Sequence, residues 1–226
     1  MNFYGQWNPP VDQVLYENYF KDFKGGTYLE CGAGDWGESC YFFEKELEWV
    51  GYNLEASKHT FQRLSRNRPH SNNINIALSS HSGSAKFTDV ISAPYGGYNN
   101  GSLSHTLALK SILDGYECIY DEYNISTLSY KDFSTLYLSE LDLMVLDVEG
   151  HELQVLKTFE YAKILPRVLC VEYPVSGFQN IYNILVTDKL NYRFDFVSYN
   201  NAFYSKGFDK NNGWFGETEK ISDTSL

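Results

Sequence analysis

Short apolar runs alternate with amphipathic, helix-forming stretches along most of this chain. Apolar residues recur at helical spacing from Val11 to Phe23 and predict a helix over 10–24. Runs that suit buried strands follow at 27–31, 49–54, 74–78, 125–129, 141–148 and 168–173, separated by helical patterns from 38 onward and at 58–67, 131–138, 152–159 and 179–189. Because such alternation produces parallel strands with helices on both faces, we predict an α/β fold with a doubly wound, mostly parallel sheet.

Three segments depart from this alternation. Residues 84–88 follow Gly83 and are expected as an edge hairpin, and 192–198 with 202–205 predict a closing C-terminal antiparallel hairpin. Residues 91–122 begin with a loop rich in Pro, Gly and Asn, and a connection of this length predicts a lid insertion. We therefore expect one domain over 1–210 and a polar tail over 211–226.

Composition and charge argue against several classes of protein. With 43% hydrophobic residues in 226, the chain can bury a full core, and no apolar run is long enough to span a membrane. A formal charge of −11 opposes binding to nucleic acid. Four widely spaced cysteines without C-x-x-C spacing speak against a zinc site or a disulfide framework. The N-terminal residues lack a signal-peptide pattern, so we expect a cytoplasmic protein.

The first strand pattern runs into a glycine loop. Gly32, Gly34 and Gly37 match G-x-G-x-x-G, a turn whose glycines let backbone N–H groups approach a nucleotide at the start of a helix. Glu55 ends the next strand pattern, about 20 residues further on, where an acid accepts hydrogen bonds from ribose hydroxyls. The loop therefore predicts an adenosine site.

The charges around this loop favour one adenosine ligand over another. Carboxylates at Glu30 and Asp35 would repel the pyrophosphate of NAD but attract the sulfonium and ammonium groups of S-adenosylmethionine. We therefore expect S-adenosylmethionine as the cofactor. Two alternatives stay open: an NAD-dependent nucleotide-sugar oxidoreductase or epimerase, which would lack its usual Tyr-x-x-x-Lys pair here, and a non-catalytic nucleotide-binding module of the same fold.

Acidic residues also follow the other predicted core strands. Asp147 and Glu149 come after 141–146, and Glu172 closes 168–172. Ligands of doubly wound sheets bind beyond the carboxyl ends of the strands. We therefore expect these acids, together with Glu30 and Glu55, to lie around one site.

Several of these motifs together resemble a known family. They are Tyr4-Gly5-Gln6, the loop Leu29-Glu30-Cys31-Gly32-Ala33-Gly34, Glu55-Ala56-Ser57, Ile76-Ala77-Leu78 followed by Gly83 and Phe87, Thr127-Leu128, and Asp147-Val148-Glu149-Gly150-His151-Glu152-Leu153. The chain is thereby similar to the FkbM-type family of S-adenosylmethionine-dependent methyltransferases, from near residue 4 to about 200. The resemblance implies a class I (Rossmann-like) methyltransferase fold and O-methylation of a hydroxyl on a carbohydrate or small metabolite.

The resemblance also assigns roles to residues. It implies that Glu30, Gly32, Ala33 and Gly34 surround the methionine part of the cofactor, while Glu55 holds the ribose. Asp35 and Ala56 are expected beside them. Ala77 and Leu78 would lie along the adenine, and Asp147 with Glu149 would face the methyl-transfer side. Trp36 departs from the small residues common in such loops.

An acceptor hydroxyl must lose its proton, which requires a base. The candidates are Asp147, Glu149, His151 and Glu172, of which we favour Asp147 or Glu149. The plainer alternative is that His151 and the acids Asp147, Glu149 and above all Glu152 only cap the helix that follows. Two carboxylates and an imidazole could also hold a metal, but the ligand set is incomplete and we expect none. We expect a small-molecule or glycan acceptor.

Overall fold

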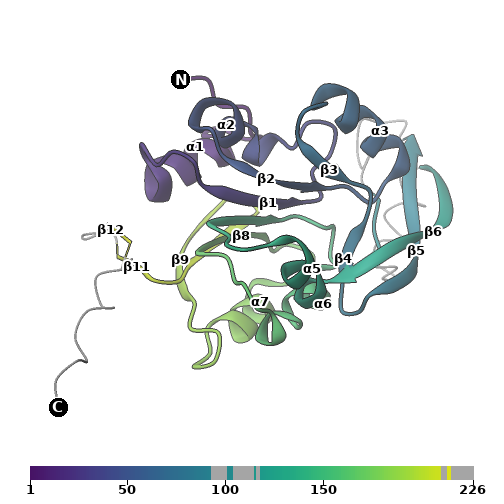
Figure 1. Cartoon of the computed structure of the whole chain (residues 1–226). Helices are drawn as coiled ribbons and strands as arrows, with labels where there is room; N and C mark the ends of the chain where they lie inside the picture. Colours follow the sequence, from purple (N-terminus) through teal and green to yellow (C-terminus); the bar gives the residue numbers. More distant parts are fainter. Residues whose placement is uncertain (93–100, 104–114, 116–117, 210–212, 215–226) are drawn as a thin grey trace, which may run out of the picture.

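A computed structural model describes residues 1–92, 101–103, 115, 118–209 and 213–214 of this chain. Its centre is a seven-stranded sheet in the order β3-β2-β1-β7-β8-β10-β9 (Figure 1). The strands are β1 (Thr27–Cys31), β2 (Val50–Leu54), β3 (Asn72–Ile74), β7 (Leu143–Leu146), β8 (Val168–Glu172), β9 (Arg193–Ser198) and β10 (Asn201–Ser205). β1, β2, β3, β7 and β8 pair in parallel, and β10 runs antiparallel to both β8 and β9. The α/β fold and the closing hairpin are confirmed.

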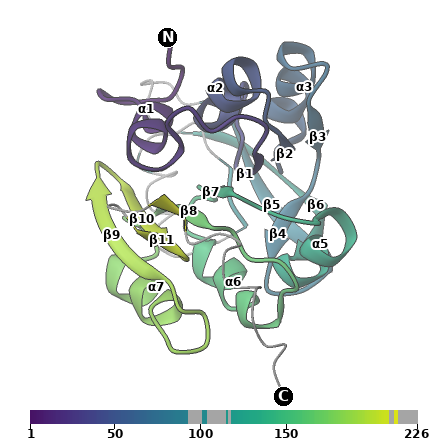
Figure 2. The ribbon, with the colours of Figure 1, turned by 60° about the vertical axis from the view of Figure 1, so that its left-hand side comes forward.

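Helices cover both faces of this sheet (Figures 1 and 2). One face carries α1 (Val11–Leu15), its π-helical continuation Tyr16–Phe20, and α2 (Glu38–Leu47), which bury an aromatic cluster around Phe20, Phe43 and Trp49. The other face carries α5 (Tyr130–Tyr137), α6 (Glu152–Leu156) with the 3-10 turn Phe159–Tyr161, and α7 (Phe178–Leu185). α3 (Lys58–Asn67) links β2 to β3. Because helices cover both faces of the sheet, we expect a ligand site at the ends of the strands, where such folds bind their ligands.

A second, three-stranded sheet stands beside the first. It has the order β4-β6-β5 and consists of β4 (Ala77–Ser79), β5 (Gly83–Ser92) and β6 (Ile119–Ser129), with β5 antiparallel to β6. The predicted single strand 74–78 was therefore wrong, because Ile74 ends β3 and Ala77 begins β4 in the other sheet. Asn75 lies between them and donates from Nδ2 to the carbonyls of Glu55 (2.7 Å) and Ala56 (3.1 Å), which turns the chain.

Other boundaries also differ from the predicted ones. The N-terminal helical stretch stops at Phe20 rather than 24, because Lys21 is not helical and Asp22 has a positive φ of 61°. Both ends of the predicted lid over 91–122 belong to strands, since β5 reaches Ser92 and β6 begins at Ile119. The interior of that segment lies outside the described residues apart from 101–103, 115 and 118, as does the tail apart from β12 (Gly213–Trp214), which pairs with β11 (Phe208–Asp209).

No helix in the described part of the chain has the length and apolar character needed to cross a bilayer.

Candidate functional site

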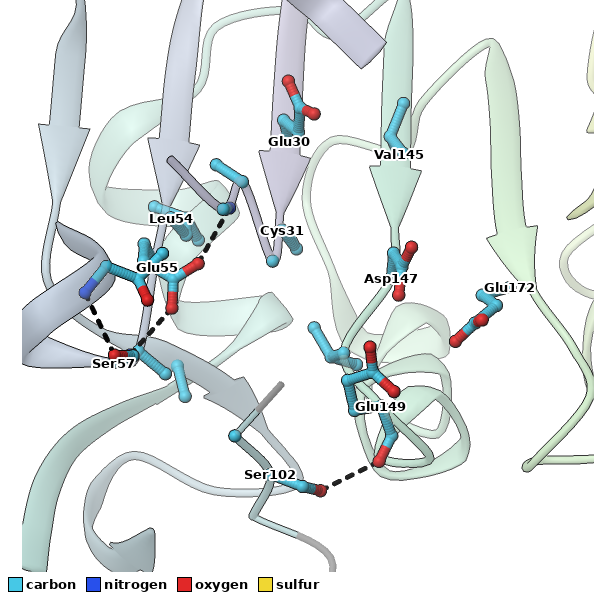
Figure 3. Close-up of a pocket in the computed structure, with 18 of the residues that line it drawn as sticks. Glu30, Cys31, Leu54, Glu55, Ser57, Ser102, Val145, Asp147, Glu149 and Glu172 are labelled. Atoms are coloured by element: carbon cyan, nitrogen blue, oxygen red, sulfur yellow. Dashed lines mark hydrogen bonds between the residues drawn. The ribbon is translucent and has the colours of Figure 1, made fainter. Parts of the chain in front are cut away.

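A cavity of about 1030 Å³ opens at the carboxyl ends of β1, β2, β7 and β8 (Figure 3). This volume lies at the upper end of the range for small-molecule sites. The second sheet contributes one wall, through Ala77 and Leu78 of β4 and Phe87 and Val90 of β5. Seven carboxyl groups lie in the described lining: Glu30, Asp35, Glu38, Glu55, Asp147, Glu149 and Glu172. The acids predicted at the strand ends thus border one space.

Residues 32–36 of the glycine loop line this cavity. Gly32 has φ +80°, and a Cβ there would lie 1.7 Å from the carbonyl oxygen of Asp147, so only glycine lets the loop cross the end of β7. Gly34 has φ +61° with nothing within 4 Å of a Cβ position, which leaves its backbone open on the cavity side. Ala33 is buried between them. An open backbone of this kind is a surface against which a ligand can lie.

Glu55 ties the loop after β1 to the loop after β2. One carboxylate oxygen accepts from the Gly34 amide (2.9 Å) and the other from the Ser57 amide (2.8 Å). Burial raises the pKa of Glu55 to about 7, although these two hydrogen bonds oppose the rise. Each carboxylate oxygen has two acceptor positions, so Glu55 keeps capacity for two ligand hydroxyls.

Glu30 is more enclosed than the resemblance implies. Its two oxygens accept from the amides of Ser39 and Cys40 (both 3.1 Å) at the start of α2, and its side chain is almost fully buried. Burial raises the pKa of Glu30 to about 7, against the lowering effect of nearby Arg68. The Glu30 carboxylate therefore borders the cavity while it holds α2 against β1.

Three acids meet at the far side of the cavity. Carboxylate oxygens of Asp147, Glu149 and Glu172 all lie within 4.8 Å of one another, and the three side chains turn toward a common space (Figure 3). Burial, then the charges of Glu172 and Glu149, hold the pKa of Asp147 well above its usual range. Burial and Glu149 raise the pKa of Glu172 to about 7. Crowded carboxyl groups of this kind bind a cation or share protons.

The loop between β7 and α6 carries two of these acids, Asp147 and Glu149. Glu149 has a left-handed φ of 53°, and its carbonyl accepts from Ser102 Oγ at 2.8 Å. Glu152 folds back so that one carboxylate oxygen accepts from the amides of Val148 (3.0 Å) and Gly150 (3.2 Å), while the other accepts from Ser176 Oγ. Capping is thus the role of Glu152, whereas Asp147 and Glu149 face the cavity.

His151 reaches the end of β4 in the second sheet. Its Nε2 is 3.0 Å from Ser79 Oγ at the end of β4, and it gives α6 no side-chain cap. Burial lowers the pKa of His151 to about 4, so the ring is neutral at physiological pH. A base this weak is poorly matched to an alcohol.

The remaining predicted cofactor residues also line the cavity. Ala56, Ala77 and Leu78 provide apolar surface beside Glu55. Asp35 stands at the rim, where its carboxylate pairs with Arg63 Nε at 2.9 Å. This ion pair gives Asp35 a partner within the protein and reduces its attraction for a ligand.

One group of residues that lines the cavity was not predicted from the sequence. Gln6 and Trp7 of the N-terminal segment line the cavity, together with Asn200 of the β9–β10 turn and Asn201, the first residue of β10. Trp7 stacks on Tyr199 with ring centroids 5.2 Å apart, which joins two segments that are 192 positions apart along the chain. Nothing local in the sequence marks such a contact.

One family model and several solved structures are similar to this chain. The model of the methyltransferase FkbM domain matches residues 30–194, which is more than half of the chain. Similar solved structures include a putative methyltransferase, yhhF, from Escherichia coli (12% identity, 89% of this chain and 87% of that chain, TM-score 0.46) and a TehB-like SAM-dependent methyltransferase from Corynebacterium glutamicum (11%, 81% and 81%, 0.41). A third is the N-terminal domain of human METTL16 in complex with SAH (10%, 86% and 65%, 0.39). No curated protein matches the sequence.

Proposed function

Since this chain belongs to the methyltransferase FkbM family and is an S-adenosylmethionine-dependent methyltransferase, we propose that it methylates a hydroxyl group of a carbohydrate or other small metabolite. The observation that carries the proposal is the acid group Asp147, Glu149 and Glu172, which borders the same cavity as the glycine loop. The carboxylates of this group attract a cation, and one of them can accept a proton.

The described residues fit the cofactor. The open Gly34 backbone offers a surface for the methionine part, Glu55 retains acceptor positions for ribose hydroxyls, and Ala77 and Leu78 provide apolar surface for an adenine. Four buried or half-buried carboxyl groups with raised pKa values surround this space: Glu30, Glu55, Asp147 and Glu172. Each is more stable as an anion next to a positive charge, which S-adenosylmethionine carries on sulfur and nitrogen.

The acid group supplies what the acceptor needs. S-adenosylmethionine, when bound, provides an activated methyl group. Asp147 and Glu172 lie where a hydroxyl can donate to a carboxylate, and the one that accepts the hydroxyl proton would act as general base. Glu172, whose pKa is about 7, is ionised in part at neutral pH and suits this role. Holding hydroxyl and methyl donor together contributes about 7–11 kcal/mol to such reactions.

The cavity wall indicates the character of the acceptor. Gln6, Asn200 and Asn201 offer amide groups that donate and accept hydrogen bonds, and Trp7 offers a ring for stacking. Arg63 is the one Arg or Lys in the described part of the lining, and it is already paired with Asp35. A neutral, hydroxyl-rich acceptor fits these walls better than an anionic one.

Two measurements test the proposal. Calorimetry should show binding of S-adenosylmethionine and none of NAD, whose pyrophosphate would face the acids. Transfer of label from methyl-labelled S-adenosylmethionine should then be followed across neutral glycans, glycolipids and phosphorylated or carboxylated sugars, with mass spectrometry to locate the new methyl. Methylation at oxygen of a neutral acceptor supports the proposal. Transfer to nitrogen or carbon, or preference for anionic acceptors, would overturn it.

A further inference from the structure

A buried arginine lies directly behind the glycine loop, outside the described lining of the cavity. Arg68 follows α3, is 2% exposed, and donates through every guanidinium nitrogen. Its Nη1 reaches the carbonyls of Trp36 and Gly37 (both 3.0 Å) and Asn53 Oδ1 (3.1 Å). Its Nη2 reaches Tyr28 Oη and Glu44 Oε2 (both 2.7 Å), and its Nε reaches Ser71 Oγ (3.1 Å).

Two of these acceptors belong to the loop itself. The carbonyls of Trp36 and Gly37 lie at the point where the loop turns into α2, and Nη1 holds both. The neighbouring Asn67 Nδ2 donates to the Asp35 carbonyl at 2.9 Å. The end of α3 therefore fixes three successive carbonyls of the loop, which orients the peptide groups that follow Gly34.

This contact explains the third glycine of the motif. Gly37 has φ +60°, and a Cβ there would lie 2.2 Å from Arg68 Nη1. In a dinucleotide site the third glycine permits close packing of helix and strand. Here the left-handed φ and the closeness of the Arg68 guanidinium both favour glycine, and Asn53 Oδ1 (3.0 Å) and Glu30 Oε2 (3.1 Å) also lie near the Cβ position.

The hydrogen bonds made by the side chain at position 68 require a guanidinium group. A guanidinium presents five donors in a fixed plane, whereas an ammonium group has three donors at a single point. Lysine at 68 could keep the charge near Glu44 but could not reach the two loop carbonyls, Asn53 and Tyr28 at once. Arg68 thus combines a salt bridge with Glu44 and a geometric clamp on the loop.

We propose that Arg68 is a positioning residue for the cofactor: by clamping the carbonyls of Trp36 and Gly37, its guanidinium holds the glycine loop in the shape that binds S-adenosylmethionine. This inference rests on the proposed placement of the cofactor on the loop. Arg68 acts through the loop backbone.

The test compares Arg68→Lys with Arg66→Lys, an exposed neighbour on α3. In Arg68→Lys we expect the dissociation constant for S-adenosylmethionine, measured by calorimetry, to rise about tenfold or more, since hydrogen bonds from charged groups are lost. The kcat at saturating cofactor and the KM for the acceptor should stay within about threefold of wild type, and Arg66→Lys should bind as wild type.

Gly37→Ala provides a second route if Arg68→Lys does not fold. Its methyl group displaces the guanidinium without removing it, and Gly25→Ala, at φ +69° with open space around it, controls for backbone strain alone. Gly37→Ala should weaken cofactor binding about tenfold or more, whereas Gly25→Ala should bind as wild type; where Arg68→Lys folds, the double variant should be no worse than either single one. Unchanged cofactor affinity in a folded variant, or equal losses for cofactor and acceptor, would overturn the inference. Failure of the wild-type protein to bind S-adenosylmethionine would instead overturn the proposed cofactor placement.

Discussion

Several carboxyl groups that border the cavity are buried, and their burial makes a nearby positive charge favourable. Glu30, Glu55 and Glu172 have pKa values raised to about 7, chiefly by burial. A cation next to any of them recovers the solvation that burial removed. We therefore expect these groups to favour a ligand that carries positive charge, as S-adenosylmethionine does.

Gly34 allows the role of the open loop backbone to be tested at one position. Gly34→Ala and Gly25→Ala both place alanine at a positive φ (+61° and +69°) with nothing within 4 Å of the new atom. Each should lose about 1–2 kcal/mol of folding stability through backbone strain. Because only Gly34 borders the cavity, its variant alone should bind S-adenosylmethionine less tightly. Calorimetry and thermal unfolding of both variants check this, and equal affinities would contradict it.

Glu172 allows the base to be identified from the pH profile. The rate of methyl transfer should rise with pH through about 7 as Glu172 loses its proton, and level off above. Glu172→Gln cannot accept the proton, so kcat should fall by about 10²-fold or more and lose this rising limb. Rates with labelled methyl donor between about pH 5.5 and 9 measure both effects. Glu46→Gln, at an exposed position, is the control, and an unchanged profile in Glu172→Gln would exclude Glu172 as the base.

At the scale of elements, the N-terminal segment acts as a wall of the site. Asp12 is fully buried and accepts from the amides of Tyr4 (2.6 Å) and Gly5 (3.1 Å), which fixes the chain ahead of α1. This brings Trp7 against Tyr199 and to the edge of the cavity. Since the segment contacts the β9–β10 turn through Trp7 and Tyr199, we expect it to affect the acceptor more than the cofactor.

Trp7→Ala tests this wall. Removal of the ring should raise the KM for the acceptor about tenfold through lost stacking, and leave the affinity for S-adenosylmethionine unchanged. Steady-state kinetics with the best acceptor and calorimetry with the cofactor measure the two effects. Tyr161→Ala, which removes an exposed aromatic ring outside the described lining, should change neither. A larger effect on cofactor than on acceptor would place Trp7 elsewhere in the site.

Local patterns predict most elements here, because the alternation of strands and helices is a property of neighbouring residues. Strand 27–31 and helix 58–67 have the predicted bounds. The break at Asn75 was not predictable, since it depends on side-chain bonds to carbonyls 19 and 20 positions away. Arg68 was missed because a basic residue at the end of a helix ordinarily indicates an exposed cap. Its burial follows from contacts with β1, α2, β2 and the glycine loop, which lie far from it along the chain.

Across the whole molecule, the raised pKa values link folding to pH. Between about pH 4.5 and 7 the folded chain keeps protons on Glu30, Glu55 and Glu172 that the unfolded chain releases. The free energy of unfolding therefore falls as pH rises through this range and levels off above it.

Thermal unfolding of the ligand-free protein checks this linkage. The Tm should be several degrees lower at about pH 8 than at about pH 6, because each raised carboxyl lowers the free energy of unfolding by about 1 kcal/mol between these two pH values. Glu55→Gln carries no titrating proton, so its Tm should depend less on pH. Saturating S-adenosylmethionine should raise the Tm more at pH 8, where the acids are ionised. A Tm that increases between pH 6 and 8 would contradict the assigned pKa directions.

The contact between Trp7 and Tyr199 has a practical consequence for anyone who handles this enzyme. A bulky group attached close to Trp7 would lie near a ring that borders the cavity. A purification handle on the N-terminal segment would place such a group there, so turnover assays should be run after the handle has been cleaved.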